Sequence, residues 1–591
     1  MKPLFSAPVV PAIIEWRDDE PWSTVYQDVY FSKKAGIEES TAVFIRGNDL
    51  ETRFKQPGNF SILETGFGTG LNFLIASDLF ERTSPSGLLH FFSVEKHPLK
   101  KEDLIRALRT YPGLPCETLI ERYAPWTHGF HHIVLSPRVI LTLMIGDVSE
   151  ILPLVRGRFD ALFLDGFAPR QNEDMWSREI ALELARISGP GTTLASFTSA
   201  GHVRRALIEA GFAVEKTPGF GTKREMIRGS MPGTPRRQTP SHAVVIGAGI
   251  AGASTAFSLA KRGVPCTIID RQDKPAREGS GNRRGVFQPV LAASPTPWSR
   301  WTLAGFEYLC SLLRSLNFPT NFCGVFQAAE DEKELQRIQR AISVWPAELG
   351  RILSRPEASR VTGVDIPFPG VLFPGAGFLS PSDLTQRLIL QSNAQTLYGQ
   401  SVARVEKMDS GFRITTAQTT VDADCLFYCA GTGTPQFVDA PVSATRGQIH
   451  YIPPWNETLR TVICADGYLI PGNDFWTAGS TYSRTDTTSS PHIEGQNEIL
   501  EKLRNAIPDV PHFDTLLDGR VGYRISAKDR FAIFGKLGDH AFLSTAHGSR
   551  GIVSAPLAAE VIASLACGMP VPVESDLMNH FQNRYAIKHK L

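Results

Sequence analysis

Glycines and acidic residues recur together at two places in this 591-residue chain, LETGFGTG at Leu63–Gly70 and VVIGAGIAG at Val244–Gly252. Each segment follows a short apolar run and precedes one with helical apolar spacing. In this context glycines let the backbone approach a ligand, and the amides of a helix N-terminus face its polar groups. An acid at the end of a neighbouring strand can then accept hydrogen bonds from ribose hydroxyls. The two turns predict two nucleotide-type cofactor sites.

At the first turn, Glu95 ends the apolar run HFFSVE and is the predicted ribose ligand, while Asp147, in IGD after a third run, is placed to accept from an adenine amino group. Each of these residues alone has an alternative as a solvated strand-end acid or a turn glycine. The full set of predicted cofactor ligands here is Glu64, Gly66, Gly68, Gly70, Glu95 and Asp147.

A further acid, Asp165, ends a fourth apolar run and is followed by GFAPRQNEDMW. Phe167 and Trp176 bring two aromatic rings to the same edge, where a doubly wound sheet binds ligands. We therefore predict that Asp165 orients an amine substrate and accepts its proton, and that the two rings bind the substrate. The alternative role of Asp165 is a helix N-cap.

At the second turn, Gly247, Gly249 and Gly252 have the G-x-G-x-x-G spacing, and Asp270 ends the next strand, PCTIID. This βαβ unit predicts FAD or NAD. Three later segments favour FAD: GSGNRRGVFQP (279–289), LFYCAGTGT (426–434) and STAHGSRGIVSAPLAAEVIAS (544–564), the last aiming a helix N-terminus at the flavin. The predicted ligands in these segments are Ser280, Asn282, Gly431, Gly548, Ser549, Arg550 and Gly551.

The elements that must position these residues divide at a linker-like segment, GSMPGTPRRQTPS (229–241). We predict two α/β domains, 1–235 and 236–591. In the first, apolar runs alternate with amphipathic segments, which is typical of a mostly parallel sheet, and FAVEKTPGFGTKREMIRG (212–229) predicts an antiparallel pair closing it.

Composition fits an ordinary multidomain protein, with 42% hydrophobic and 20% charged residues and a net charge of +1. No apolar run reaches the roughly 18 residues of a membrane span, and the first ten residues do not resemble a secretory signal. We therefore expect a cytoplasmic protein, and we expect a monomer although the sequence leaves the oligomeric state open. The eight cysteines are scattered without a zinc-site spacing, so we expect reduced, mostly buried thiols and no metal.

The first half resembles class I, Rossmann-like S-adenosylmethionine-dependent methyltransferases, and the second resembles the glycine oxidase and D-amino acid oxidase family of FAD-dependent oxidoreductases. The second resemblance implies a mixed α+β substrate subdomain at about 300–375 and 440–530. It also implies hydride transfer from an amine C–H to flavin and hydrolysis of the resulting imine. Substrate carboxylates in that family are bound by arginine, which nominates Arg524 as catalytic and Arg446 as a second choice. Either arginine has an alternative as a structural ion pair.

The whole chain resembles the bifunctional tRNA 5-methylaminomethyl-2-thiouridine biosynthesis proteins. The resemblance rests on IEWRDDEPWSTVYQDVYFS (14–32), LETGFGTGLNF, DGFAP, TSAGHVRRALIEAGF (198–212), GFGTKREM (219–226), SGNRRG, FLSP (378–381), RGQ (446–448) and HGSRG. It implies that the flavin half removes the carboxymethyl group from 5-carboxymethylaminomethyl-uridine at the tRNA wobble position, and that the other half then methylates the exposed amine. One departure is Glu173, where that family usually has proline.

The implied partner is the tRNA anticodon loop. Basic residues that we expect to contact its phosphates are Lys223, Arg224, Arg204, Arg205, Arg236 and Arg237. Two other interpretations stay open. One is a small-molecule secondary-amine oxidase fused to a small-molecule N-methyltransferase, and the other is a chain in which one half has become a non-catalytic RNA-binding module.

Overall fold

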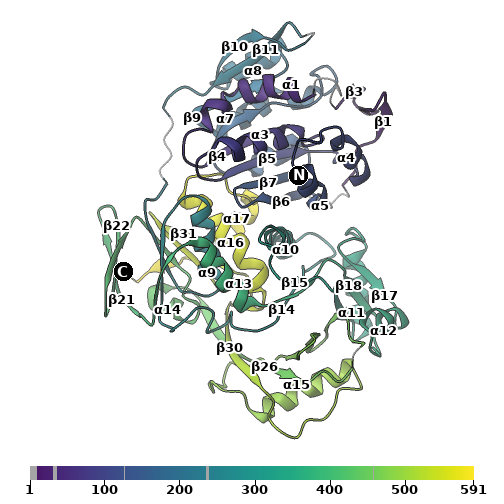
Figure 1. Cartoon of the computed structure of the whole chain (residues 1–591), viewed down its shortest axis with the longest axis vertical. Helices are drawn as coiled ribbons and strands as arrows, with labels where there is room; N and C mark the ends of the chain where they lie inside the picture. The colour runs from purple at the N-terminus through teal and green to yellow at the C-terminus, as the bar shows by residue number, and fades with distance from the viewer. Residues whose placement is uncertain are drawn as a thin grey trace. The chain divides into compact units, whose positions relative to one another are not determined.

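The computed structural model describes residues 9–30, 36–124, 127–221, 223–234, 239–456, 458–582 and 584–590. The chain separates into two compact units (Figure 1). Unit 1 comprises Met1–Thr239, Lys261–Gly263 and Ser564–Met578, and unit 2 comprises Pro240–Ala260, Val264–Ala563 and Asn579–Leu591. Residues 235–238, which hold the expected boundary together with Arg236 and Arg237, lie outside the described residues.

Unit 1 is built on an eight-stranded sheet of order β10-β11-β9-β8-β4-β5-β7-β6. The strands are β4 (Phe60–Glu64), β5 (Leu89–Glu95), β6 (Gly129–Ser136), β7 (Val139–Ile145), β8 (Phe159–Phe163), β9 (Ser188–Ser196), β10 (Ala213–Pro218) and β11 (Glu225–Ser230). The five central strands pair in parallel, and β10 and β11 form the predicted antiparallel pair at one edge. Strand β6, antiparallel to β7 at the other edge, was not predicted. Its paired histidines interrupt an otherwise apolar run.

Helices cover both faces of this sheet (Figure 1). They include α3 (Leu71–Thr83), α4 (Lys101–Leu108), α6 (Val148–Ile151), α7 (Arg178–Arg186) and α8 (Gly201–Glu209). Neighbouring strand residues enter different cores: Ile62 and Phe91 belong to one apolar cluster, Leu63 and Phe92 to another. Because successive side chains of a strand point to opposite faces, this is the pattern of a sheet buried on both sides.

A small antiparallel sheet precedes these elements and was not predicted. It consists of β1 (Ile14–Arg17), β2 (Glu20–Ser23) and β3 (Asp28–Val29). Its link to the main fold includes a hydrogen bond from the Ala168 amide to the Asp28 carboxylate at 3.1 Å. The segment therefore lies next to the loop that follows Asp165.

Unit 2 contains a six-stranded sheet of order β20-β13-β12-β24-β32-β31. Its strands are β12 (Ala243–Ile246), β13 (Cys266–Asp270), β20 (Gln395–Tyr398), β24 (Cys425–Tyr428), β31 (Ile533–Gly538) and β32 (Ala541–Thr545). All pairs are parallel except β31–β32. Helix α9 (Ile250–Lys261) follows β12, which forms the strand–turn–helix unit expected for a dinucleotide site.

A second, eight-stranded sheet in unit 2 has the order β17-β18-β16-β27-β28-β29-β26-β30. Its strands are β16 (Val325–Ala328), β17 (Arg351–Leu353), β18 (Gly370–Phe373), β26 (Val442–Ile452), β27 (Val462–Cys464), β28 (Tyr468–Ile470), β29 (Trp476–Gly479) and β30 (Gly519–Ala527). Helix α15 (Ile493–Ala506) lies beside this sheet (Figure 1). The sheet mixes parallel and antiparallel pairs, as the predicted α+β subdomain requires.

Helix α16 (Gly551–Ala566) bears on the expectation that no apolar run is long enough to span a membrane. Among the described residues, Gly548–Ala566 is the one helical stretch that is long and apolar enough to cross a membrane, by length and composition only. Its side chains are nevertheless buried within the protein, with Ala555, Leu557 and Val561 fully enclosed. Six of the eight cysteines are buried.

Candidate active sites

The glycine turn of unit 1 borders a cavity at the carboxyl ends of the parallel strands. Gly68 and Gly70 have positive φ angles of 53° and 75°, which favour glycine. A side chain at Gly66 would approach the Asp165 carbonyl oxygen to 3.1 Å. Of the predicted residues, the cavity is lined by Gly66, Gly68, Glu95, Asp147, Asp165 and Phe167.

Glu95 is held against the turn that it was predicted to serve. Its carboxylate accepts hydrogen bonds from the amides of Gly68, at 2.9 Å, and His97, at 2.8 Å. Burial raises its pKa to about 7, and these amides lower it in part. A buried carboxylate with remaining acceptor capacity fits a ribose diol, whose two hydroxyls donate.

Asp147, which also lines this cavity, makes two kinds of contact. It caps α6 by accepting from the Ser149 amide at 2.9 Å, and it pairs with Lys96 at 2.8 Å. Burial disfavours its charge, but the hydrogen bonds from Lys96 and Ser149 outweigh that cost and lower its pKa. Asp147 is therefore an ionised acceptor at the cavity wall.

Asp165 faces this cavity and does not cap a helix. Its Oδ2 accepts from the Asn72 side-chain amide at 2.7 Å, and its Oδ1 accepts from the Gly166 amide at 2.8 Å. Thr65 donates its hydroxyl to the Asp165 carbonyl at 2.7 Å, which fixes the backbone. Burial raises the pKa of Asp165 to about 6, so the carboxylate is ionised at neutral pH but close to accepting a proton.

Glu64 and Gly70 do not line the cavity, in contrast to the prediction. Glu64 is fully buried, and its carboxylate is occupied by the Asn72 amide at 2.8 Å and the Ser93 hydroxyl at 2.6 Å. Burial, and then the nearby charge of Asp165, raise its pKa well above the usual range. The sequence gives Glu64 the position of a cofactor ligand, and the tertiary structure turns its carboxylate inward.

The aromatic wall differs from the prediction in one member. Phe167 stacks on Tyr26 with ring centroids 4.5 Å apart and meets Tyr30 edge-on at 5.2 Å, and all three line the cavity. Trp176 is instead 6% exposed in the core, where its indole N–H donates to the Phe167 carbonyl at 3.1 Å. Sequence reasoning missed Tyr26 and Tyr30, although two tyrosines in a segment outside the apolar pattern were a usable signal.

Two of the basic residues predicted to contact tRNA, Lys223 and Arg224, differ in their contacts. Lys223 is exposed, pairs with Glu39 at 2.8 Å and lies over the Phe197 ring at 4.4 Å. Its charge also lowers the pKa of Asp165 in part, which places Lys223 near the cavity. Arg224 is exposed.

The cavity of unit 2 is surrounded by the predicted dinucleotide segments. Those that line it are Gly247, Gly249, Asp270, Ser280, Gly431, Gly548 and Gly551. Those that do not are Gly252, Asn282, Ser549 and Arg550. Asn282 accepts from Arg520 at 2.8 Å, and Arg550 is half-buried and donates to the Gln288 carbonyl at 3.4 Å, so these two side chains hold neighbouring segments together.

The backbone around this cavity fits a dinucleotide. An added side chain at Gly252 would lie 1.8 Å from the Gly247 carbonyl oxygen, so glycine allows α9 to start close to β12. Gly431 has a φ of 52° and no neighbouring atom within 4 Å of an added Cβ, which leaves an open cradle. Asp270 accepts from the Ala248 and Gln272 amides at the end of β13, the position of a ribose-binding acid.

Arg524, on β30, is among the residues that line the same cavity. Its guanidinium donates to the Ser480 hydroxyl at 2.8 Å and the Thr481 carbonyl at 3.3 Å, and it lies 4.4 Å from the centre of the Tyr482 ring. Neutral partners orient the guanidinium without neutralising it, and no carboxylate of the described residues forms an ion pair with Arg524. Its charge is available for an anionic substrate group.

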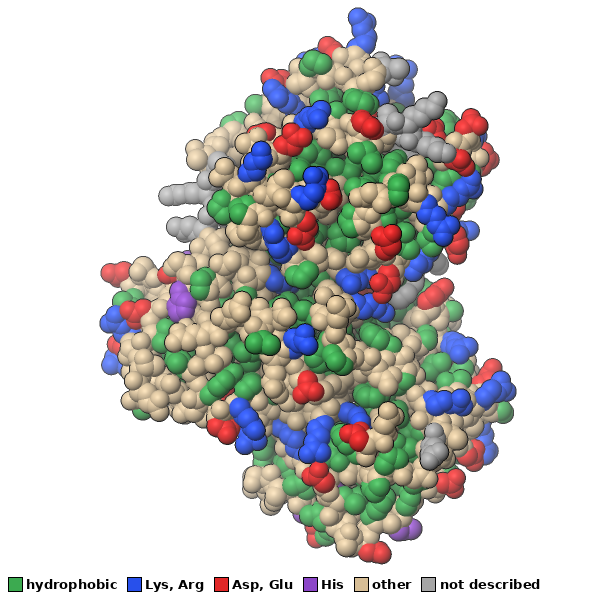
Figure 2. Space-filling model, in the orientation of Figure 1, with side chains coloured by type: hydrophobic (Ala, Val, Ile, Leu, Met, Phe, Trp, Pro, Cys, Tyr) green, Lys and Arg blue, Asp and Glu red, His purple; other side chains and the backbone are tan. Residues whose placement is uncertain are grey.

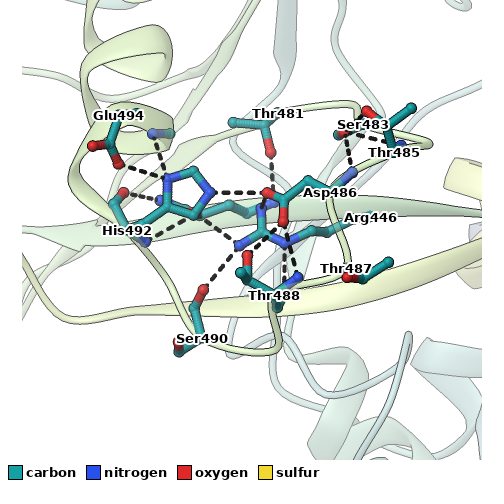
Figure 3. A network of polar contacts seen from close by, with 12 residues as sticks. Arg446, Thr481, Ser483, Thr485, Asp486, Thr487, Thr488, Ser490, His492 and Glu494 are labelled. Atoms are coloured by element: carbon teal, nitrogen blue, oxygen red, sulfur yellow. Dashed lines mark hydrogen bonds and ion pairs between the residues drawn. The ribbon is translucent and has the colours of Figure 1, made fainter.

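Arg446, the second candidate, does not reach the cavity and is a structural residue. Its side chain is 1% exposed and pairs with Asp486 at 3.2 Å (Figure 3). It also donates to the carbonyls of Thr488, at 2.7 Å, and Ser490, at 2.9 Å, while His492 approaches Asp486 at 2.9 Å. The ion-pair alternative therefore describes Arg446, which anchors the 483–492 loop to β26.

The geometry defines two sites. One unit holds a cavity lined by a glycine turn and the carboxylates of Glu95, Asp147 and Asp165, and the other holds a cavity lined by a dinucleotide-type turn, Asp270 and Arg524. Within the described residues, no group of three or more His, Cys, Asp or Glu side chains is placed to hold a metal ion. Residues 115–232 match the S-adenosyl-L-methionine-dependent methyltransferase family, and residues 242–565 match the FAD dependent oxidoreductase family. S-Adenosylmethionine and FAD are the cofactors of these two parts.

Proteins that match this chain over nearly its whole length identify its family. The chain is 38% identical to the tRNA 5-methylaminomethyl-2-thiouridine biosynthesis bifunctional protein MnmC of Pseudomonas aeruginosa, over 95% of each chain. It is 37% identical to the protein of that name from Chromobacterium violaceum, over 98% of each chain. This chain belongs to the family of tRNA 5-methylaminomethyl-2-thiouridine biosynthesis bifunctional proteins.

Solved structures resemble the flavin part in fold. Glycine oxidase from Geobacillus kaustophilus covers 55% of this chain and 94% of its own, with a TM-score of 0.50 and 20% identity. Iminodiacetate oxidase from Chelativorans sp. BNC1 covers 57% of this chain and 98% of its own, with a TM-score of 0.50 and 23% identity. The sequence prediction of a glycine-oxidase-like fold is confirmed.

Proposed function

We propose that this protein carries out two successive reactions on the wobble uridine of tRNA. The first removes the carboxymethyl group from 5-carboxymethylaminomethyl-(2-thio)uridine to give the 5-aminomethyl form, and the second methylates the exposed amine. One observation carries the proposal: each cofactor cavity presents one side chain suited to the same substituent. Arg524 suits the carboxylate, and Asp165 suits the amine.

In the oxidase site, Arg524 is proposed to bind the carboxylate of the N-substituted glycine. Both terminal nitrogens of a guanidinium can donate to the two oxygens of one carboxylate, which fixes the orientation of the group. The bonds to Ser480 and Thr481 fix the guanidinium beforehand. FAD, when bound, supplies the oxidant that accepts a hydride from the amine C–H, and water hydrolyses the resulting substrate imine.

The residues proposed to hold FAD surround its cavity. Asp270 binds the ribose, and the amides of the Gly247–Gly252 turn face the pyrophosphate. The remainder of the cavity is lined by parts of three later segments, at 279–280, 430–433 and 545–548. Gly252, Asn282, Ser549 and Arg550 act through the backbone or through neighbouring segments, since they do not line the cavity.

In the methyltransferase site, Asp165 is proposed to orient the primary amine and to accept its proton. A nucleophilic amine needs a free lone pair in line with the donor methyl group, so positioning is the larger requirement. S-Adenosylmethionine, when bound, supplies that methyl group. Glu95 is proposed to bind its ribose and Asp147 its adenine amino group, while the Phe167 and Tyr26 rings provide a surface for the base.

The tRNA anticodon loop is the proposed partner. Lys223 and Arg224 are exposed on the turn between β10 and β11, and Arg205 is exposed on α8, so each can reach a phosphate. Trp176 is omitted from the base-binding surface because it is buried. We also propose a cytoplasmic location, a monomer, and domains spanning 1–235 and 236–591.

Mass spectrometry of nucleosides from undermodified tRNA, incubated with purified protein, tests the proposal. Without S-adenosylmethionine we expect loss of the carboxymethyl group, and with it a new N-methyl group. Unchanged tRNA, together with rapid oxidation of free N-methylglycine, would favour the small-molecule alternative. The full-length similarity to the tRNA-modifying family does not favour that alternative.

A further inference from the structure

A buried carboxylate, Glu64, and a partly buried one, Asp165, share one amide in unit 1. The Nδ2 of Asn72 donates to Glu64 Oε1 at 2.8 Å and to Asp165 Oδ2 at 2.7 Å. An amide nitrogen carries two hydrogens, so both of its donors are used by these acids. Asn72 therefore connects the predicted cofactor acid to the proposed catalytic base.

The elements make this arrangement rigid. Glu64 ends β4 and Asp165 follows β8, and these strands are parallel neighbours, which brings their carboxyl ends to one edge of the sheet. Asn72 is the second residue of α3, directly after the glycine turn, and is 7% exposed. The glycine turn thus positions an amide for the base as well as approaching the cofactor.

The two acids differ in what they can contact. Asp165 and Asn72 line the cavity, whereas Glu64 does not. The second oxygen of Glu64 accepts from the Ser93 hydroxyl at 2.6 Å inside the protein. Glu64 thus has a hydrogen-bond partner on each oxygen and none of its surface faces the cofactor space.

We propose that Asn72 positions Asp165 for methyl transfer, and that Glu64 serves this amide bridge and does not bind the methyl-donor cofactor. This inference rests on the proposed methyl transfer. The Asn72 amide selects one rotamer of Asp165 and stabilises its ionised form. Glu64 holds the amide in place through its Oε1, and its other oxygen is fixed by Ser93.

The test compares three variants of the full-length protein on tRNA bearing 5-aminomethyluridine. In Asn72→Leu, a side chain of similar volume donates nothing to Asp165. We expect kcat at neutral pH to fall about 10- to 100-fold and the acid-side break in kcat/KM to move upward by about one pH unit. The substrate amine titrates identically in every variant, so the difference reports the enzyme.

Glu64→Gln keeps the size of the side chain and an oxygen that can accept from the Asn72 amide, and it separates the two roles of Glu64. We expect its dissociation constant for S-adenosylmethionine, measured by equilibrium titration, to stay within about threefold of wild type. A cofactor ligand would instead lose about 10- to 100-fold in affinity. Asn48→Leu is the control, because Asn48 is another buried asparagine, donating to the Phe44 carbonyl at 3.0 Å away from the cavity. It should lower stability without moving the pH break.

Three results would overturn the inference. These are an Asn72→Leu enzyme with wild-type kcat and pH break, a Glu64→Gln enzyme with strongly weakened cofactor binding, or an Asn48→Leu enzyme with the same shifted break as Asn72→Leu. If the wild-type protein leaves this tRNA unmethylated, the proposed function fails. The cofactor titration of Glu64→Gln then still decides the assignment of Glu64.

Discussion

The two cavities differ in the charged side chain proposed to contact the substrate, which is the Asp165 carboxylate in unit 1 and the Arg524 guanidinium in unit 2. The unit 1 cavity is walled by the carboxylates of Glu95, Asp147 and Asp165, and burial raises the pKa values of the first and last to about 7 and about 6. The unit 2 cavity brings in Arg524, whose fixed charge is oriented by neutral oxygens. A base that accepts a proton needs a pKa near neutrality, whereas an anchor for a carboxylate needs a charge that does not titrate. A glycine-rich turn therefore borders both cavities, although the charged groups proposed to contact the substrate have opposite signs.

Replacing Arg524 by methionine tests the cationic side of this comparison and has the largest expected effect. We expect kcat/KM for the oxidation to fall about 10³-fold, because loss of a charge pair at a binding site costs several kcal/mol. N-methylation of tRNA that already bears the aminomethyl group should be unchanged. Nucleoside mass spectrometry measures both reactions, and equal loss of both would contradict separate sites.

Asp165→Asn tests the acidic side. We expect methylation to fall about 10²-fold or more, since a proton acceptor contributes about 10² to 10⁴ in rate, with oxidation retained.

The same variant should change stability with a defined sign. The pKa of Asp165 is raised in the folded state, so between the ordinary carboxyl range and about pH 6 the folded protein binds a proton that the unfolded chain has released. Stability therefore falls as pH rises through that window, and Asn removes the cost. Calorimetry should show a higher Tm than wild type at pH 8, by about 2–4 °C, and no gain at pH 4.

Arg446→Met sharpens the contrast between the two arginines of unit 2. It leaves Asp486 without its cationic partner and frees the Thr488 and Ser490 carbonyls, so we expect about 2–3 kcal/mol of destabilisation. Chemical denaturation of both variants is the measurement. Arg524→Met, whose partners are neutral, should lose less stability and more activity; the reverse ranking would exchange their roles.

Phe167→Leu and Trp176→Phe are expected to have the smallest effects, and the two variants should change different properties. Phe167 lies in the cavity wall beside Tyr26, so its loss should raise KM for tRNA methylation about tenfold, in line with about 1–3 kcal/mol per stacked base. Trp176 is a core residue, and the smaller ring should lower stability by about 1–2 kcal/mol with KM unchanged. Steady-state kinetics and thermal unfolding distinguish these outcomes.

Local sequence patterns were sufficient to predict the strands and glycine turns that border the two cavities. The runs ending at Glu64, Glu95 and Asp270 are strands β4, β5 and β13, because continuous apolar sequence is what a sheet buried on both faces requires. The positive φ angles at Gly68 and Gly247 agree with the glycine spacing. Strand β6 and the β1–β3 sheet escaped prediction, since their polar and aromatic residues do not alternate clearly.

Residue types and spacing by themselves determined the two glycine turns, the acids that end their strands, the parallel sheets and the family resemblance. The tertiary structure decided which side chains face a ligand. Glu64 and Glu95 both end strands beside the first turn, yet only Glu95 lines the cavity, and Arg446 and Arg524 lie on paired strands, yet only Arg524 does. Strand ends are set by local chain chemistry, whereas the direction of a carboxylate or guanidinium depends on partners such as Asn72, 8 residues from Glu64, and Asp165, 93 residues from Asn72.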